Sequence, residues 1–71
     1  MINATKTMIA AVREVPKARR YSAMLLAEKV FFEHYAVFRA DPETWATETD
    51  EECIEMAGAI AASEVAYRFA Y

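Results

Sequence analysis

The sequence predicts an all-α protein: a short N-terminal helix followed by a long antiparallel helical hairpin, three helices in all, assembled as a homo-oligomer. Only one of the 71 residues is glycine and two are proline, too few for the closely spaced turns of an all-β domain. Fifteen residues are alanine, the residue with the highest helix propensity. Apolar residues also recur at helical spacing along two long segments. The length predicts a single domain over residues 1–71.

The apolar content is high for so short a chain. Hydrophobic residues make up 56% of the sequence, which argues against a disordered protein, and the single cysteine, Cys53, excludes a disulfide scaffold. A chain of this length buries only about 60% of the surface that it exposes when unfolded. We therefore expect that a complete core needs more than one chain.

The first predicted helix is short. Asn3 is a suitable N-cap, because its side-chain oxygen can accept a hydrogen bond from an amide of the first turn. Pro16 is expected to stop the helix, because the residue before a proline is biased away from the helical region. Between these two residues one apolar stripe is formed by Met8, Ile9, Val12 and Val15.

The second predicted helix, from about Lys17 to Ala40, is apolar around far more of its circumference than the stripe of an ordinary surface helix. Phe31 and Phe38 lie about 100° or more from Phe32, so one hairpin partner cannot cover all three. Either the short first helix or a second copy of the chain covers the rest, and we favour self-association because aromatic residues are enriched at interfaces. The expected interface residues are Met24, Phe31, Phe32, His34, Tyr35 and Phe38.

His34, in the middle of this apolar arc, allows two interpretations. It is either a partly buried histidine bonded to a neighbouring side chain, or a polar residue that gives specificity to a helix–helix interface and titrates near neutral pH. The aromatic residues likewise allow a second interpretation, in which they belong to the core of the single chain.

The third predicted helix runs from Asp50 to about Tyr71. Asp41 and Pro42 end the second helix and suit a short capped turn, and Thr49 with Glu52 forms a capping box at the start of the third. Small residues in its middle predict close approach of a neighbouring backbone, namely Ala57, Gly58, Ala61 and Ala62.

Charges are segregated along the chain. Residues 1–20 contain five bases and one acid, and residues 41–64 contain eight acids and no base. In the hairpin these blocks lie at opposite ends, about 30 Å apart, so they cannot neutralise each other within one chain across a screening length of about 8 Å. The basic end therefore predicts a site for an anionic ligand or an acidic partner. The simpler alternatives are a solvated surface and head-to-tail neutralisation by the acidic end of another subunit. Its expected residues are Arg13, Lys17, Arg19, Arg20, Tyr21, Arg68 and Tyr71.

No catalytic or metal-binding signature is present in the sequence. The single histidine and single cysteine lack a nucleophile motif, and one glycine cannot build a phosphate-binding loop. We expect no enzyme, no cofactor and no metal. A net charge of −3 argues against general nucleic-acid binding, and the chain shows neither a signal peptide nor a spanning segment, so we expect a cytoplasmic protein without a membrane partner.

These observations predict a non-enzymatic helical binding protein, a regulator or inhibitor that acts through contact with a larger protein. Compact, motif-free chains of this size are typical of phage and mobile-element accessory proteins, which favours the same interpretation. The alternative is an oligomer that binds or sequesters an anionic, nucleotide-like small molecule at the basic end. The expected partners are a second copy of the chain, as a dimer or higher oligomer, and a protein or an anionic small molecule.

Overall fold

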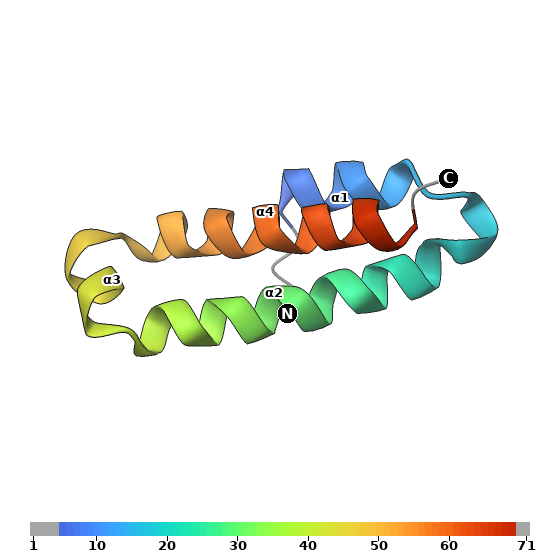
Figure 1. Ribbon diagram of the computed structural model, residues 1–71. Coiled ribbons are helices and arrows are strands. Elements are labelled where there is room, and N and C mark those ends of the chain that lie inside the picture. Colours follow the sequence, from blue (N-terminus) through green and yellow to red (C-terminus); the bar gives the residue numbers. More distant parts are fainter. Residues whose placement is uncertain (1–4, 70–71) are drawn as a thin grey trace.

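The computed structural model describes residues 5–69, and its ordered elements over that range are all helical. Figure 1 shows a hairpin of two long antiparallel helices, α2 and α4, with a short helix, α1, beside α4. The predicted all-α hairpin is confirmed. The described residues hold four α-helices and one 3₁₀ turn in place of the three predicted helices: α1 (Lys6–Arg13), η1 (Lys17–Arg19), α2 (Arg20–Ala40), α3 (Pro42–Thr47) and α4 (Asp50–Arg68).

The first helix begins and ends inside the predicted bounds. Its N-cap is Thr5, whose Oγ1 accepts a hydrogen bond from the Met8 amide at 3.2 Å, so the prediction of Asn3 as cap is wrong, and Asn3 itself lies outside the described residues. The α-helix ends at Arg13 because the chain tightens before Pro16: the amide of Val15 bonds the carbonyl oxygen three residues back, at 3.1 Å.

The second helical stretch begins at Lys17, as predicted, but its first three residues form a 3₁₀ turn. The Arg19 amide bonds the Pro16 carbonyl oxygen at 2.8 Å, an i to i+3 bond that tightens the entry to the helix. The regular α-helix therefore starts at Arg20 and runs for 21 residues to Ala40.

The connection between the long helices is itself helical. Asp41 caps α3 by accepting a hydrogen bond from the Glu43 amide at 3.0 Å, with Pro42 in the first turn. The predicted capping box is confirmed: the Glu52 amide donates to Thr49 Oγ1 at 3.1 Å and the Thr49 amide donates to Glu52 Oε1 at 2.7 Å.

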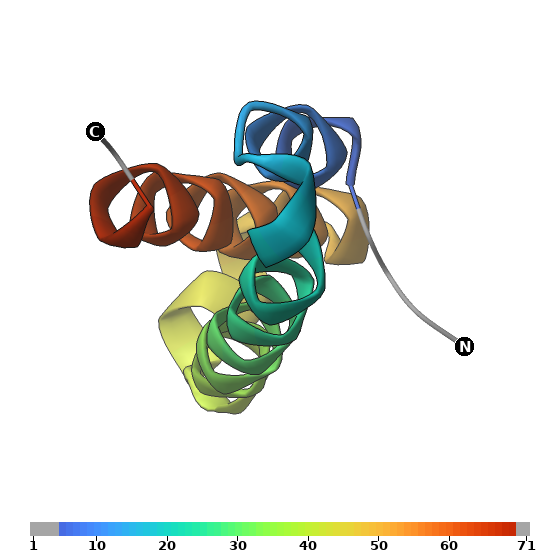
Figure 2. The ribbon, with the colours of Figure 1, turned by 90° about the vertical axis from the view of Figure 1, so that its right-hand side faces the viewer.

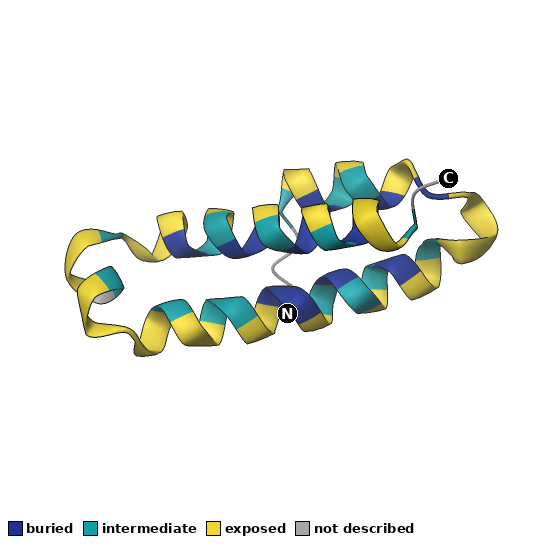
Figure 3. Cartoon of the chain, viewed as in Figure 1, coloured by how far each residue is buried: buried dark blue, intermediate teal, exposed yellow. Residues whose placement is uncertain are grey.

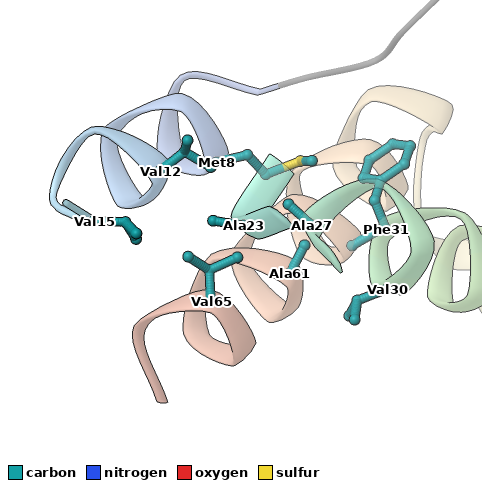
Figure 4. Packing of buried hydrophobic residues seen from close by; sticks show 10 residues of the cluster. Met8, Val12, Val15, Ala23, Ala27, Val30, Phe31, Ala61 and Val65 are labelled. Carbon is teal, nitrogen blue, oxygen red and sulfur yellow. The ribbon is translucent and has the colours of Figure 1, made fainter. Parts of the chain in front are cut away.

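The core lies where α1 meets the hairpin. Buried segments concentrate on the facing sides of α2 and α4 (Figure 3), and Figure 4 shows Met8 of α1 directed toward Ala27 and Phe31, with Val30 on the far side of α2. Small side chains allow α2 and α4 to approach closely, and larger ones are added by Met8 and Val12 of α1 and by Val15, which follows it. The buried cluster is Met8, Val12, Val15, Ala23, Ala27, Val30, Phe31, Ala57, Ala61 and Val65.

The molecule is elongated, with extents of 41 × 20 × 15 Å. Seen end-on, α1 lies on one side of the hairpin only (Figure 2). Because α1 has eight residues and α4 has nineteen, it covers only part of the hairpin's length. This arrangement sets which apolar side chains remain at the surface.

Candidate functional site

The predicted basic end exists as a structural feature. The end of α1, the η1 turn, the start of α2 and the end of α4 lie together at one end of the molecule (Figure 1). They bring together the five basic residues that the sequence singled out, with Tyr21 beside them 77% exposed. Tyr71, the remaining residue of the predicted site, lies outside the described residues.

Three of these cations interact within the chain. Arg20 donates from Nε to the Val15 carbonyl oxygen and from its terminal nitrogen to the Arg13 carbonyl oxygen, both at 2.9 Å. The Arg19 guanidinium lies 4.7 Å from the centre of the Phe69 ring. Arg68 Nε pairs with Glu64 at 3.0 Å. The Arg20 and Arg19 contacts link different segments at this end, and the Arg68 pair lies within α4, so three of the five basic residues have structural contacts.

Arg13 and Lys17 are the exposed basic residues left for a ligand at this end. Two surface hollows in the described part of the chain lie elsewhere. One lies between the start of α1 and the middle of α4, lined in part by Thr5, Lys6 and Glu55, and the other lies among the acidic residues at the start of α4. The ligand-binding role of the basic end stays a prediction.

The predicted interface residues divide between core and surface. Phe31 is 1% exposed, so the structure corrects it to a core residue of the single chain: Met8 of α1 reaches it from one side (Figure 4). Met24 and Phe38 are half-buried against the core. His34 is partly buried, as one of its two interpretations expected, but its Nδ1 lies 3.0 Å from the Val30 carbonyl oxygen, a backbone partner in place of the expected side chain.

Tyr35 closes the hairpin near its loop. Its ring stacks on Phe31 at 5.7 Å between centroids, and its hydroxyl donates to Asp50 Oδ1 at 2.7 Å. Arg39 bonds the same Asp50 oxygen and lies 3.3 Å from the Tyr35 hydroxyl. The Tyr35 hydrogen bond and the Arg39 guanidinium hold the pKa of Asp50 below its usual range, and the bond to Asp50 raises the pKa of Tyr35.

An exposed apolar line runs along the outer edge of α2. Tyr21, Leu25 and Phe32 are 77%, 48% and 44% exposed, and their spacing of four and seven residues places them on one line of the helix. We call these three residues the outer strip. Helical periodicity places Leu25 beside Phe32 on one flank of the helix, but the predicted interface includes only Phe32 of the two, and Tyr21 is predicted at the basic end.

A second apolar surface faces away from α1. On α4, Gly58 faces Thr5 of α1, and Ile60 lies about 200° from Gly58 around the helix, so it points to the opposite side. Met56, Ile60 and Tyr67 repeat the spacing of the outer strip, as do Leu26, Val30 and Val37 on α2.

We call this surface the open face, and it was missed at the sequence level because the position of α1 defines it. Its most exposed members are Val37, 62% exposed, and Tyr67, 80% exposed. Leu26 and Ile60 are partly buried and pack against the core.

The structure and the comparisons add three further findings. Among the described residues, no three histidine, cysteine or acidic side chains are grouped as a metal site would require, and none of the helices has the length and apolarity to cross a membrane. No family model, no curated protein and no solved structure matches the chain.

Proposed function

We propose that this protein is a non-enzymatic helical binding protein that regulates or inhibits a larger protein by inserting the outer strip of α2 into an apolar groove. The observation that carries the proposal is the line of three large, exposed apolar side chains, Tyr21, Leu25 and Phe32. A helix that presents apolar residues along one line is the ligand in helix-in-groove recognition.

The surroundings of the outer strip support this role. Glu28, between Leu25 and Phe32, is half-buried, and Lys29 beside the strip is exposed, which gives an apolar centre with a charged margin, as interfaces have. Phe32 is held edge-on against the buried Phe31 ring, 5.2 Å between centroids at an angle of 81°. A side chain that is already ordered loses less entropy on binding.

Cys53 and His34 would be the first candidates for catalysis, but both are engaged in the fold. Cys53 is 0% exposed, and a buried thiol in apolar surroundings is inert. The His34 ring is engaged with a backbone carbonyl oxygen. Both observations favour a binding protein over an enzyme.

The test is affinity capture from the host cell lysate with quantitative mass spectrometry. The wild-type chain is compared with Tyr21→Ser and Phe32→Ser, and with Tyr67→Ser as the matched control, because Tyr67 and Tyr21 are equally exposed on different surfaces. A partner that is captured by the wild type and by Tyr67→Ser and is lost with both outer-strip variants supports the proposal. Equal capture by all four chains overturns it.

The convergence of Arg13 and Lys17 beside Tyr21 favours one second candidate, an anionic, nucleotide-like ligand at the basic end. Its test is thermal unfolding with a panel of nucleotides, comparing the wild type with the Arg13→Ala/Lys17→Ala variant. A rise in Tm with one nucleotide that the variant loses supports it. The absence of a rise with any nucleotide contradicts it.

A further inference from the structure

We infer that two copies of this chain pack antiparallel through the open face, so that the basic end of each copy lies against the acidic end of the other. The open face and the outer strip are different surfaces, so this inference is independent of the proposed function. Two observations on the molecule carry it: the apolar character of the open face and the separation of charge along the long axis.

The open face consists of apolar residues from two helices. Figure 2 shows that α1 leaves one side of the hairpin uncovered. Helical spacing places three residues of α2 and three of α4 toward that side, of which Val30 is itself buried. Those toward the middle, such as Leu26 and Ile60, are partly buried, whereas Val37 and Tyr67 are largely exposed. Ser22, Glu33 and Ser63 are exposed at its outer margins, and such an apolar centre with a polar rim is the anatomy of a protein interface.

The charges of the two ends are opposite. The basic end holds five bases and two acids, a formal charge of +3, and the end that contains α3 holds seven acids and one base, a formal charge of −6. The acids at this end are Asp41, Glu43, Glu48, Asp50, Glu51, Glu52 and Glu55, and the base is Arg39.

The distance between the ends decides the orientation. The molecule is 41 Å long, about five times the screening length of roughly 8 Å at physiological salt, so the ends of one chain do not neutralise each other. A parallel dimer would bring the two acidic ends together, and their repulsion would oppose association. An antiparallel dimer places −6 against +3 at both ends, and it makes one surface self-complementary, as a two-fold interface requires.

The first experiment measures association by sedimentation equilibrium. We expect the wild type to be a dimer, Val37→Ser and Tyr67→Ser to weaken association at least about tenfold, and Leu25→Ser, on the outer strip and 48% exposed at the wild-type residue, to leave it unchanged. Raising the salt concentration should also weaken the dimer, because it screens the end-to-end attraction. A monomeric wild type at about 100 µM, or equal effects of Val37→Ser and Leu25→Ser, overturns the inference.

The second experiment measures orientation. A spin label on Ala46→Cys marks the acidic end, since Ala46 is exposed on α3, and the buried Cys53 is inaccessible to the reagent. The antiparallel dimer predicts a distance between labels close to the 41 Å length of the molecule, and a distance below about half that length overturns the antiparallel arrangement. Because partner capture depends on Tyr21 and dimerisation on Tyr67, failure of this inference is distinguishable from failure of the proposed function.

Discussion

Gly58 lies where the N-cap of α1 meets α4. A β-carbon at position 58 would lie 2.5 Å from Thr5 Oγ1 and 2.6 Å from Thr5 Cγ2, and Thr5 cannot turn away without losing its cap bond to Met8. Forcing an extra carbon into a packed site costs about 1–3 kcal/mol, against a gain of about 1 kcal/mol in helix propensity. We predict that Gly58→Ala lowers the free energy of unfolding by on the order of 1 kcal/mol, measured by urea denaturation.

In a control background that lacks the Thr5 side chain, Gly58→Ala should raise the free energy of unfolding instead of lowering it. Glycine at an N-cap costs only a few tenths of a kcal/mol relative to threonine, and Thr5→Gly removes the side chain that the new β-carbon would strike. In that background Gly58→Ala should stabilise the protein by about 1 kcal/mol. Destabilisation of equal size in both backgrounds would show that Thr5 is not the residue that excludes a side chain from position 58.

Asp50 and Glu52 make the stability of the protein sensitive to acid. The pKa of Asp50 is lowered by its hydrogen bond from Tyr35 and by Arg39, and the pKa of Glu52 is lowered chiefly by the Thr49 amide. A carboxyl whose folded pKa lies below its unfolded value, about 4 for these groups, stabilises the fold above that value. That contribution is lost as the pH falls through the lower folded pKa.

We therefore predict that Tm decreases as the pH falls below about 4, and that Asp50→Asn combined with Glu52→Gln makes this decrease shallower. Thermal unfolding followed by circular dichroism between pH 7 and pH 2.5 measures it. Glu55→Gln is the matched control, because Glu55 is an exposed acid of the same helix outside both networks. A double variant with the same acid dependence as Glu55→Gln would contradict the prediction.

At the scale of elements, Arg20 joins α1 to α2. Its guanidinium donates to the carbonyl oxygens of Arg13 and Val15, which lie in and just after the last turn of α1, where carbonyl groups lack helical partners and a cation is favourable. Such bonds to a charged group contribute about 1.5–3 kcal/mol when buried, less here because the site is partly exposed. We predict that Arg20→Ala costs about 1 kcal/mol of unfolding free energy.

Two comparisons test the geometry of this link. Arg20→Lys should recover only part of the loss, because an ammonium group lacks the planar fork that reaches both carbonyl oxygens. Lys17→Ala, an exposed cation at the same end, should change stability by less than about 0.5 kcal/mol. Equal losses for Arg20→Ala and Lys17→Ala would show that Arg20 contributes only charge.

The helices were largely predictable because capping residues and prolines close in the sequence determine where they begin and end. Thr49 and Glu52 specify a capping box through their spacing alone, and Asp41 with Pro42 specifies the start of α3. The start of α1 was assigned to the wrong residue because Asn3 and Thr5 are both good caps. Contact with Gly58 selects Thr5, and that contact depends on tertiary packing.

At the scale of the whole molecule, the sequence predicted the charge separation but not the division of the aromatic residues. The basic and acidic residues are clustered in different segments of the sequence, so formation of the hairpin is enough to place them at opposite ends. The burial of Phe31 beside the exposed Phe32 depends on which side of the hairpin α1 covers, and helical periodicity gives angles around one helix without that information. The outer strip and the open face are likewise defined by the side of the hairpin that α1 covers.

The burial of Phe31 and the exposure of Phe32 lead to a prediction about whether one chain completes its own core. Phe31 is enclosed by residues of a single chain, and truncation of a buried phenylalanine costs about 3–5 kcal/mol, a large part of the stability of a small domain. Phe31→Ala should therefore destabilise the protein strongly, whereas Phe32→Ala, 44% exposed at the wild-type residue, should cost about 1 kcal/mol or less. Urea denaturation at about 1 µM and about 100 µM chain measures both variants.

The loss caused by Phe31→Ala, relative to the wild type, should be the same at the two concentrations. Association of copies stabilises a protein by an amount that depends on concentration, whereas a core closed within one chain contributes equally at any dilution. If the loss grew with concentration, Phe31 would belong to an interface between copies, as the sequence alone predicted. If the loss of unfolding free energy is independent of concentration, the core around Phe31 is completed within one chain. A second copy then adds stability only through association at the open face.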